Sequence, residues 1–570
     1  MNNSSLRPPA IAAIFAMTLA LLLCAPLSRA ASPELSDASR EALRLGERIY
    51  REGILPSGEP LRASATSGHA APGLTFACIS CHLRSGLGAF DEGIYTPPIN
   101  GAKLFRPLPR MFKGNELSID IVEPLRPAYT DDSLIEVLRS GKGPGGRVLG
   151  DGMPRYPLKD SDARLLVSYL RSLSSHFSPG VVEQNLHFAT VISDGVNSKK
   201  SEAMLGVLEQ FIKNQNSRFQ AASDPRSRLM AQNMMGSVLA GRSFSLSHWT
   251  LTGPPDSWRR QLEEYNRKEP PFALLGGMVE GSWQPVHRFC EDNGIPSFFP
   301  LTELPVISDV DWYTLYLSRG YYQEGESAAR YLHDRGELPG GVLQLVRSSP
   351  EGEALSAGFQ QTWQALGHRA PVKVQLPSGT AVDREFLTRL LDKEQPETLL
   401  LWDNAGVIPT LESVSRRDGR PGTVILSARY LGEKIWNLPE SLRDEVFLTY
   451  PFFFSPYTPR SGMAAQKIPV DLKKSLRRSE VPLMDELQQT ATLTKSLTQL
   501  FFPLLIELKG NYYRDNLLDT MGMMADQQYP LYGRVSFGTG SRYAAKGCHI
   551  VQLTHGADPE LVKKSSWDSQ

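Results

Sequence analysis

The spacing of hydrophobic and polar positions changes near residue 178 and divides the chain into two regions. Residues 41–53 and 160–173 place apolar side chains three and four positions apart, which is the period of an amphipathic helix. Between these segments the chain is crowded with glycine and proline, which predicts long loops. Such a region needs something besides a dense apolar core to hold it together, for example a bound group. We therefore expect a small helical domain over residues 36–176 and a linker over residues 177–186.

Beyond residue 186, short apolar runs typical of buried strands alternate with amphipathic segments typical of helices. Strands are expected at residues 187–193, 243–251, 272–276, 295–299, 341–347, 372–376, 398–402 and 423–426, with helices at 202–213, 257–268, 284–293, 353–366 and 383–392. Repeated strand–helix units predict parallel sheets covered on both faces. About ten such units exceed one sheet, so we expect an α/β domain with two lobes over residues 187–556. Its last part is expected to be helical over 481–524, with strands at 533–537 and 548–553, and residues 557–570 form a tail.

Charge and composition remove some functional classes. The 570 residues include 61 Lys and Arg and 61 Asp and Glu, so the formal net charge is zero. A neutral chain has no general attraction to nucleic acid or to an anionic membrane. We therefore expect no nucleic-acid partner.

The N-terminus has the pattern of an export signal. Arg7 precedes an apolar run over residues 11–23, and Ser28 and Ala30 are small residues at the −3 and −1 positions before Ala31. The pattern predicts a cleavable signal peptide over residues 1–30. Lipidation at Cys24 is the less favoured alternative, because the preceding leucine occupies a position where a small residue is required. No later run is apolar and long enough to span a membrane, so we expect a periplasmic protein without a transmembrane segment.

The segment Cys78-Ile79-Ser80-Cys81-His82 has the C-x-x-C-H spacing of c-type haem attachment. The two thiols would add to the vinyl groups of the porphyrin, and the next residue would present its imidazole to the iron. The C-x-x-C part alone would fit a redox dithiol or half of a zinc site. The histidine and the export signal favour haem, and a zinc ribbon would need a second C-x-x-C, which the chain lacks. We predict one covalent haem c on Cys78 and Cys81, with His82 as an axial ligand.

Met153 is the expected second axial ligand. It follows a glycine-rich loop, precedes Pro154, and lies just before the last predicted helix of the domain. This position suits a ligand carried by a loop better than a core residue. A thioether ligand favours ferrous iron and raises the reduction potential. The alternatives are Met111, His69 and His176.

With these residues in place, residues 41–175 resemble an all-α class I cytochrome c domain. Gly46 and Tyr50, four apart on the first predicted helix, match the glycine–aromatic pair that contacts the last helix in that family. Leu166 and Tyr169 match the corresponding pair on the last helix. A glycine at such a crossing lets two helices approach closely.

The same resemblance gives Pro97 a role. In the family, a proline carbonyl accepts the Nδ1–H bond of the axial histidine, which fixes the tautomer and strengthens the ligand. Pro97 stands in a similar loop, although a few residues further from the haem motif than in the shortest family members.

Residues 187–553 resemble the periplasmic solute-binding proteins of the Leu/Ile/Val type, which have a two-lobed α/β (type I) fold. The resemblance is carried by residues 274–278, 294–300, 316–319 and 341–352. It implies two lobes that close about a hinge on a ligand. Loops after parallel strands line such a cleft, so the candidate ligand residues are Ser193, Asp194, Met278, Glu280, Thr302, Ser318 and Arg319.

One departure bears on the ligand. The family often presents Ser-Ala-Thr to an amino acid, where this chain has Thr302-Glu303-Leu304. This difference puts the usual amino-acid head-group site in doubt.

Two functions remain open. The first is electron transfer by a periplasmic mono-haem c-type cytochrome, because an iron with two protein ligands has no open site for a substrate. Its redox partner would be a dehydrogenase, an oxidase or another cytochrome, and the lobed domain would dock a partner or gate the transfer through a bound solute. The alternative is a solute-binding or sensor protein with an accessory haem. A haem enzyme such as a peroxidase ranks below both, so we expect an electron carrier rather than a catalyst.

Two cysteines remain outside the haem motif. Cys290 and Cys548 form either a disulfide, which an oxidising compartment permits, or two buried free thiols.

Overall fold

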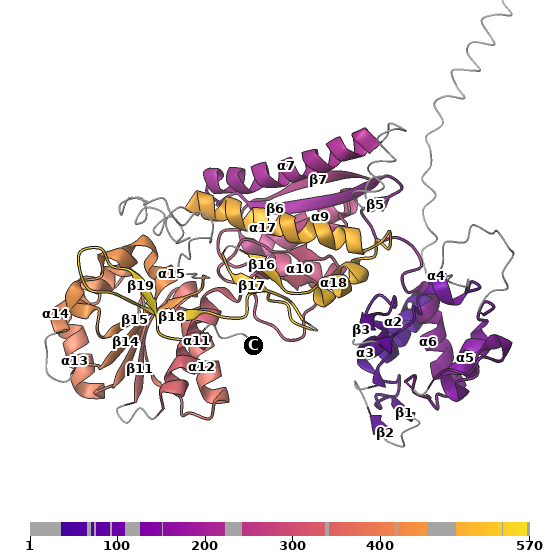
Figure 1. Cartoon of the computed structure of the whole chain (residues 1–570), viewed down its shortest axis with the longest axis horizontal. Helices are drawn as coiled ribbons and strands as arrows, with labels where there is room; N and C mark the ends of the chain where they lie inside the picture. The colour runs from indigo at the N-terminus through magenta and orange to yellow at the C-terminus, as the bar shows by residue number, and fades with distance from the viewer. Residues whose placement is uncertain are drawn as a thin grey trace, which may run out of the picture. The chain divides into compact units, whose positions relative to one another are not determined.

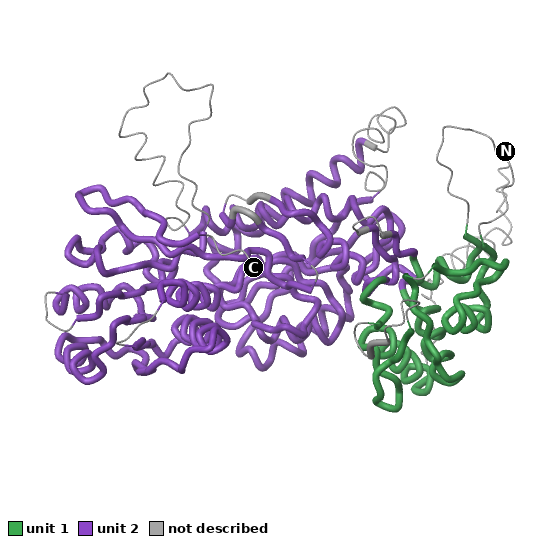
Figure 2. Tube along the Cα trace, turned by 60° about the horizontal axis from the view of Figure 1, so that its bottom comes forward, with its two compact units in different colours: residues 1–81, 98–173 green, residues 82–97, 174–570 purple. Residues whose placement is uncertain are grey.

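The computed structural model describes residues 36–64, 70–72, 76–91, 94–108, 126–150, 152–222, 242–336, 341–415, 420–452, 486–529, 531–538 and 540–566. The chain divides into two compact units, the first within residues 1–81 and 98–173 and the second within residues 82–97 and 174–570 (Figure 2). The predicted signal peptide and two alternative iron ligands, His69 and Met111, lie outside the described residues. The unit boundary differs from the predicted one, because residues 82–97 group with the second unit rather than with residues 36–176.

The helices of the first unit and of the adjoining haem motif are α2 (Asp37–Glu52), α3 (Ile79–His82), α4 (Gly101–Leu104), α5 (Asp131–Ser140) and α6 (Asp160–Ser172) (Figure 1). Ser36 caps α2 by accepting a hydrogen bond from the Ser39 amide at 3.2 Å, and the helix ends at Gly53, which has φ +63°. A short antiparallel pair, β1 (Arg62–Ser64) and β2 (Ala70–Pro72), adds strand to a region expected to be all-helical.

Helices α2 and α6 cross at the glycine that the sequence singles out. A Cβ atom on Gly46 would lie 2.3 Å from the Leu165 carbonyl oxygen, so no larger side chain fits without moving a backbone. One turn further, the rings of Tyr50 and Tyr169 pack with their centroids 5.4 Å apart. Both tyrosines belong to the apolar core of this unit.

The second unit contains two sheets. The first has strand order β10-β9-β8-β6-β5, with β7 also paired to β6, and its strands are parallel apart from β5. Its strands are β5 (Val181–Val182), β6 (Asn185–Ser193), β7 (Ser243–Leu251), β8 (Ala273–Leu275), β9 (Ser297–Phe298) and β10 (Thr314–Leu315). Strand β5 and the start of β6 lie within the predicted linker, because residues 181–186 pair back on β6 as a hairpin. The sheet and its helices are called the first lobe.

The helices of the first lobe include α7 (Ser198–Ala222), α9 (Trp258–Lys268) and α10 (Gln284–Asn293), together with α17 (Glu486–Glu507) and α18 (Arg514–Met523) from far along the chain. Figure 1 shows α7 and α17 side by side over β6 and β7. Phe501 of α17 packs edge-on against Phe188 of β6 and Phe298 of β9, at centroid distances of 5.4 and 5.0 Å. The predicted helical stretch 481–524 is therefore two helices, separated at residues 508–513.

The second sheet has strand order β12-β11-β13-β14-β15-β18-β19. Its strands are β11 (Val342–Arg347), β12 (Val372–Leu376), β13 (Thr398–Trp402), β14 (Thr423–Ser427), β15 (Val446–Tyr450), β18 (His549–Leu553) and β19 (Leu561–Lys563). Strands β11 to β15 are parallel, and β18 and β19 add antiparallel pairs. Because β19 pairs with β18, the sheet continues into the range predicted as a tail.

The helices of this second lobe are α11 (Gly320–Arg335), α12 (Pro350–Ala365), α13 (Arg384–Glu394), α14 (Ile408–Val414) and α15 (Ala428–Leu431). Two short strand pairs also belong to the second unit: β3 (Phe90–Asp91) with β4 (Ile94–Tyr95), and β16 (Gln527–Tyr529) with β17 (Gly533–Val535). Its 3-10 turns include Pro255–Ser257, Ala405–Val407, Gly432–Asn437 and Glu440–Leu442. A further 3-10 turn, Pro144–Gly146, belongs to the first unit.

The two remaining cysteines are free thiols. Cys290 and Cys548 are both fully buried and neither is in a disulfide. The free-thiol alternative therefore holds. In the described part of the chain, no helix combines the length and apolar character needed to cross a membrane.

Candidate functional site

A cavity of about 380 Å³ opens within the second unit, at the carboxyl ends of its parallel strands. The loops after β6, β8, β9 and β10 supply one wall, and the rest comes from residues of α7, α11, α15 and α17 and from Tyr532. The lining therefore comes from both lobes. This is the position at which parallel α/β sheets bind ligands.

Four of the seven candidate ligand residues line this cavity. They are Met278, Glu280, Thr302 and Ser318. Each stands in a loop directly after a strand of the first sheet, which is the reason that they were predicted.

The other three candidates are not among the lining residues and have local partners instead. Ser193 accepts a hydrogen bond from the amide of Glu280 at 2.8 Å, and so supports the loop that does line the cavity. Asp194 accepts from the Gly253 amide at 3.2 Å. Arg319 pairs with Glu326 at 2.8 Å.

Arg429, which the sequence analysis missed, is the most unusual group of the lining. It follows β14, in α15, and its side chain is only 6% exposed. It lies within ion-pair distance of Glu303 and of Glu324, the latter at 3.2 Å. None of its three guanidinium nitrogens has the geometry of a hydrogen bond to any described residue. The guanidinium therefore meets carboxylates from two directions, and a carboxylate is the acceptor that its position at the cavity wall suits.

Glu324 lies behind Arg429 and is fully buried. It accepts hydrogen bonds from the Ser427 hydroxyl at 2.7 Å and from the Thr449 hydroxyl at 2.6 Å. Burial raises the pKa of Glu324 to about 8, although the two hydroxyls lower it. Burial thus favours the protonated form, which would leave the charge of Arg429 unbalanced from this side.

The remaining charges of the lining are Lys200, Glu486 and Glu280. Lys200 and Glu486 pair with each other at 2.7 Å. Glu280 is exposed, and no cation lies within ion-pair distance of it among the described residues. The cavity thus has a buried cation on one side and a carboxylate at its rim.

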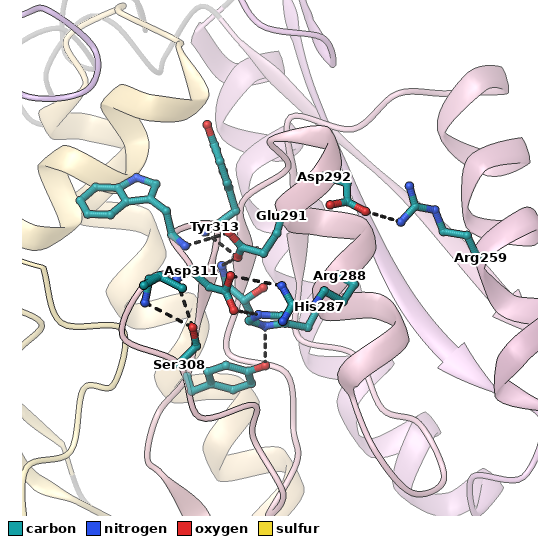
Figure 3. A network of polar contacts seen from close by, with 12 residues as sticks. Arg259, His287, Arg288, Glu291, Asp292, Ser308, Asp311 and Tyr313 are labelled. Carbon is teal, nitrogen blue, oxygen red and sulfur yellow. Dashed lines mark hydrogen bonds and ion pairs between the residues drawn. The ribbon is translucent and has the colours of Figure 1, made fainter. Parts of the chain in front are cut away.

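Tyr316 lines the cavity and contacts a network of polar groups that includes His287 and Asp311 (Figure 3). His287 on α10 is 2% exposed, and its ring nitrogens lie 2.9 Å from the Tyr316 hydroxyl and 2.9 Å from Asp311. Burial alone would raise the pKa of Asp311, but hydrogen bonds from His287 and Ser308 hold it below its usual range. The network fixes the strand-end residues in place.

Next to this network, Glu291 of α10 accepts three backbone N–H groups. The donors are the amides of Trp312, Tyr313 and Thr314, at 2.8, 2.7 and 3.0 Å. The Glu291 side chain (Figure 3) therefore fixes the segment that enters β10 and the first residue of that strand.

In the first unit, the two cysteines of the haem motif differ in environment. Cys78 is buried and Cys81 is exposed. Burial raises the pKa of the Cys78 thiol to about 12. Met153 is partly buried and packs against the apolar cluster that contains Cys78.

In the second unit, His82 is 5% exposed and its Nδ1 lies 2.9 Å from the carbonyl oxygen of Pro97. A carbonyl only accepts, so Nδ1 carries the proton and Nε2 keeps its lone pair. Burial lowers the pKa of His82 to about 4, which keeps the ring neutral. His176, an alternative ligand, is exposed.

These features fit a c-type haem. The contact that the resemblance implies for Pro97 is present, and it selects the tautomer in which Nε2 can bind iron. No cluster of three or more His, Cys, Asp or Glu side chains suited to a metal ion occurs among the described residues, and a haem iron takes only two protein ligands.

No protein-family model and no curated protein matches this chain. Solved structures that resemble it include a solute-binding protein of an ABC transporter from Rhodopseudomonas palustris BisB5 in complex with 3,4-dihydroxybenzoic acid (13% identity, 68% of this chain and 98% of that chain, TM-score 0.43). Others are a branched-chain amino acid ABC transporter protein from Thermus thermophilus with bound valine (14%, 68% and 98%, 0.44) and an ABC transporter substrate-binding protein from Sphaerobacter thermophilus (12%, 67% and 96%, 0.46). At these identities and TM-scores, the likeness carries no argument about function.

Proposed function

We propose that this protein is a periplasmic, two-lobed solute-binding protein whose cavity takes a small solute with a carboxylate group, and that it carries one haem c as a redox group. The observation that carries the solute is Arg429, a buried guanidinium at the cavity wall whose partner on the cavity side, Glu303, is a partly exposed side chain. The resemblance to the Leu/Ile/Val-type binding proteins supports a cleft that closes on its ligand.

A carboxylate is the partner that a guanidinium fits best. Its two oxygens accept two parallel N–H bonds, and such charge-assisted pairs are stronger than neutral hydrogen bonds. Glu303 occupies this role in the structure by pairing with Arg429. The Glu303 side chain is 38% exposed, so it can turn toward water when a solute carboxylate takes its place.

Glu303 is also the residue at which this chain departs from the family pattern. Glu303 stands where the family often presents a small residue to the amino-acid head group. In this chain the recognition of the carboxylate would move to Arg429, on the other lobe. A solute held by one lobe and contacted by the other stabilises the closed form.

The other charges restrict the class further. Glu280 and Glu303 would repel a second negative group on the solute, whereas Glu280 would attract an ammonium group. We therefore expect monocarboxylates, including amino acids, to bind better than dicarboxylates. A cavity of about 380 Å³ suits a molecule of this size.

Calorimetric titration of the purified full-length protein tests the proposal. The panel contains α-amino acids, hydroxy acids, aromatic monocarboxylates, dicarboxylates, neutral sugars and polyamines. Arg429→Gln is expected to weaken binding of the best monocarboxylate by about ten- to a hundredfold, the effect of losing a charged hydrogen-bond pair. The matched control is Arg389→Gln, since that side chain is 72% exposed on α13.

A second variant protects the test against misfolding of the first. Glu303→Gln removes the competing carboxylate and is expected to tighten binding of the same solute. Preference for neutral sugars or polyamines over all carboxylates would refute the assignment of Arg429. So would equal affinity of the wild type, Arg429→Gln and Glu303→Gln.

Electron transfer is the second candidate function, and a specific contact favours it. The imidazole of His82 follows C-x-x-C directly, is buried and neutral, and donates its Nδ1–H to Pro97. When bound, the haem would supply one-electron transfer, with Cys78 and Cys81 holding the porphyrin and Met153 as the second axial ligand. A periplasmic dehydrogenase, an oxidase or another cytochrome would exchange the electron.

Expression in a host that matures c-type cytochromes tests this function. The expected product is coloured and heavier by one haem, and replacing both Cys78 and Cys81 by alanine removes the added mass. Met153→Ala is expected to lower the midpoint potential, because the thioether favours ferrous iron. A colourless wild-type product of unmodified mass would exclude the haem.

A further inference from the structure

The loop that carries the axial histidine is fastened to α18 by a buried carboxylate. Asp519 on α18 accepts the backbone N–H of Ser85 at 2.8 Å and lies 3.4 Å from the backbone nitrogen of Arg84. Asp519 and Ser85 are 5% and 0% exposed, so this contact is closed to water. Both loop residues stand within three positions of His82, in the part of the chain that groups with the second unit.

Ser85 is held from two further directions. Its carbonyl oxygen accepts a hydrogen bond from the Ser174 hydroxyl at 2.8 Å, and its own hydroxyl accepts from the Leu87 amide at 3.3 Å. The loop also closes on itself, because the Gly88 amide donates to the His82 carbonyl at 3.2 Å. The backbone next to the iron ligand therefore has little freedom.

The side chain of Arg84 adds a second attachment. Its Nε lies 3.7 Å from Asp515 of α18, and its guanidinium stands over the Trp312 ring, 4.7 Å from the centroid. The Tyr313 hydroxyl donates to the same Asp515 at 2.9 Å. Arg542 also stands over the Trp312 ring, with 3.8 Å between its guanidinium carbon and the ring centroid.

The surface that receives Arg84 is rigid. Glu291 fixes the amides of Trp312 and Tyr313, as described above, and these residues lead directly into β10 (Figure 3). The segment of residues 312–318 thus begins at the Arg84 attachment and ends in the lining of the solute cavity.

We propose that Asp519 is a positioning residue for the axial ligand: through Ser85 and Arg84 it fixes the loop that orients His82, and so makes the haem potential depend on the solute-binding unit. The inference rests on the proposed haem. The orientation of an axial imidazole and the hydrogen bond at its second nitrogen set how strongly it donates to the iron. A loosened loop weakens that donation and favours ferrous iron.

The first measurement needs no haem. Hydrogen–deuterium exchange of the full chain, without haem, compares the wild type with Asp519→Asn, which keeps the shape of the side chain and removes its charge. Amides of residues 84–88 are expected to exchange about tenfold faster in the variant, the effect of weakening one buried charged hydrogen bond. Glu507→Gln is the matched control, because it removes a 56%-exposed carboxylate at the end of α17.

The second measurement uses the holoprotein. The midpoint potential of Asp519→Asn is expected to rise above that of the wild type and of Glu507→Gln, with haem content unchanged, because both the looser histidine and the lost negative charge disfavour ferric iron. Arg84→Gln, which leaves Asp519 intact, is expected to shift the potential in the same direction by less. If Asp519→Asn does not fold, the potential of Arg84→Gln still tests the proposal.

The results distinguish the positioning role of Asp519 from the presence of a haem. If the wild type takes up haem and the Asp519→Asn and Arg84→Gln potentials equal that of the control, the positioning role is wrong and the proposed haem stands. Unchanged exchange at residues 84–88 also overturns the positioning role, with or without haem. If the wild type takes up no haem, the proposed redox group and the positioning role both fail.

Discussion

The buried Glu324 gives the sharpest prediction about stability. Its pKa is raised to about 8 by burial, against an ordinary value of 4.5. The folded protein therefore keeps a proton on this group over a pH range in which the unfolded chain has lost it. The contribution of Glu324 to the stability of the second unit is fully present below pH 4.5. It falls as the pH rises toward about 8 and changes no further above that value.

The magnitude follows from the shift. Each pKa unit corresponds to about 1.4 kcal/mol, so a rise from 4.5 to about 8 costs the folded state about 5 kcal/mol at high pH. Whole domains are stable by about 5–15 kcal/mol, so an effect of this size is measurable. Other ionisable groups face Glu324, namely Arg429, Tyr321 and Cys548, and they are identical in the variant proposed next.

Glu324→Gln removes the titration and keeps an oxygen that can accept from Ser427 and Thr449. We expect the variant and the wild type to have similar stability at pH 5. At pH 9 the variant should be more stable by up to about 5 kcal/mol. The difference between the two proteins should change most steeply between these values.

Urea unfolding followed by tryptophan fluorescence measures this difference. All eight tryptophans lie between residues 249 and 567, so the signal reports on the second unit alone. The control is Glu385→Gln, whose carboxylate is 81% exposed. A stability difference between Glu324→Gln and the wild type that is the same at pH 5 and pH 9 would refute the raised pKa.

Three other predictions use the same protein. Asp403→Ala leaves the buried Arg347 without the carboxylate that its Nε contacts at 2.9 Å. The free energy of unfolding of the second unit, measured in urea, should fall by about 3–5 kcal/mol, whereas Arg389→Ala at an exposed position should change it little. Gly46→Val should lower the melting temperature of the first unit, measured by circular dichroism, whereas Gly150→Ala, at a glycine with open space around it, should not. Equal melting temperatures of the two variants would argue against the close helix crossing. In the holoprotein, saturation with the best monocarboxylate of the panel should shift the midpoint potential, and Asp519→Asn should abolish that shift while solute affinity stays constant.

Local patterns were sufficient for much of the fold. The run predicted as a strand at residues 243–251 is β7 (Ser243–Leu251), and the run at 398–402 is β13 (Thr398–Trp402). Both are apolar stretches bounded by turn residues, and their burial does not depend on which strand is the neighbour. The cavity loops after β8 and β9 could be predicted for the same reason, because the carboxyl ends of parallel strands meet at one edge. No strand was predicted at β10, and Ser318 after it was a candidate through the family resemblance.

Predictions that depended on pairing were less accurate. β5 lies in the predicted linker and β19 in the predicted tail, because these edge strands are only two and three residues long. Their register comes from the strand beside them, and a single short segment gives no sign of it.

The haem motif could be predicted from the sequence, whereas the charged groups of the cavity could not. C-x-x-C-H is a local arrangement, and the amino-acid sequence alone determines that two thiols and an imidazole stand together. The tertiary structure decided that Arg429 reaches the cavity, that Glu324 is buried behind it, and that Asp519 holds the loop after His82. Ser85 and Asp519 are 434 residues apart, and hydrogen bonds and burial act through space, so only the folded chain brings such groups together.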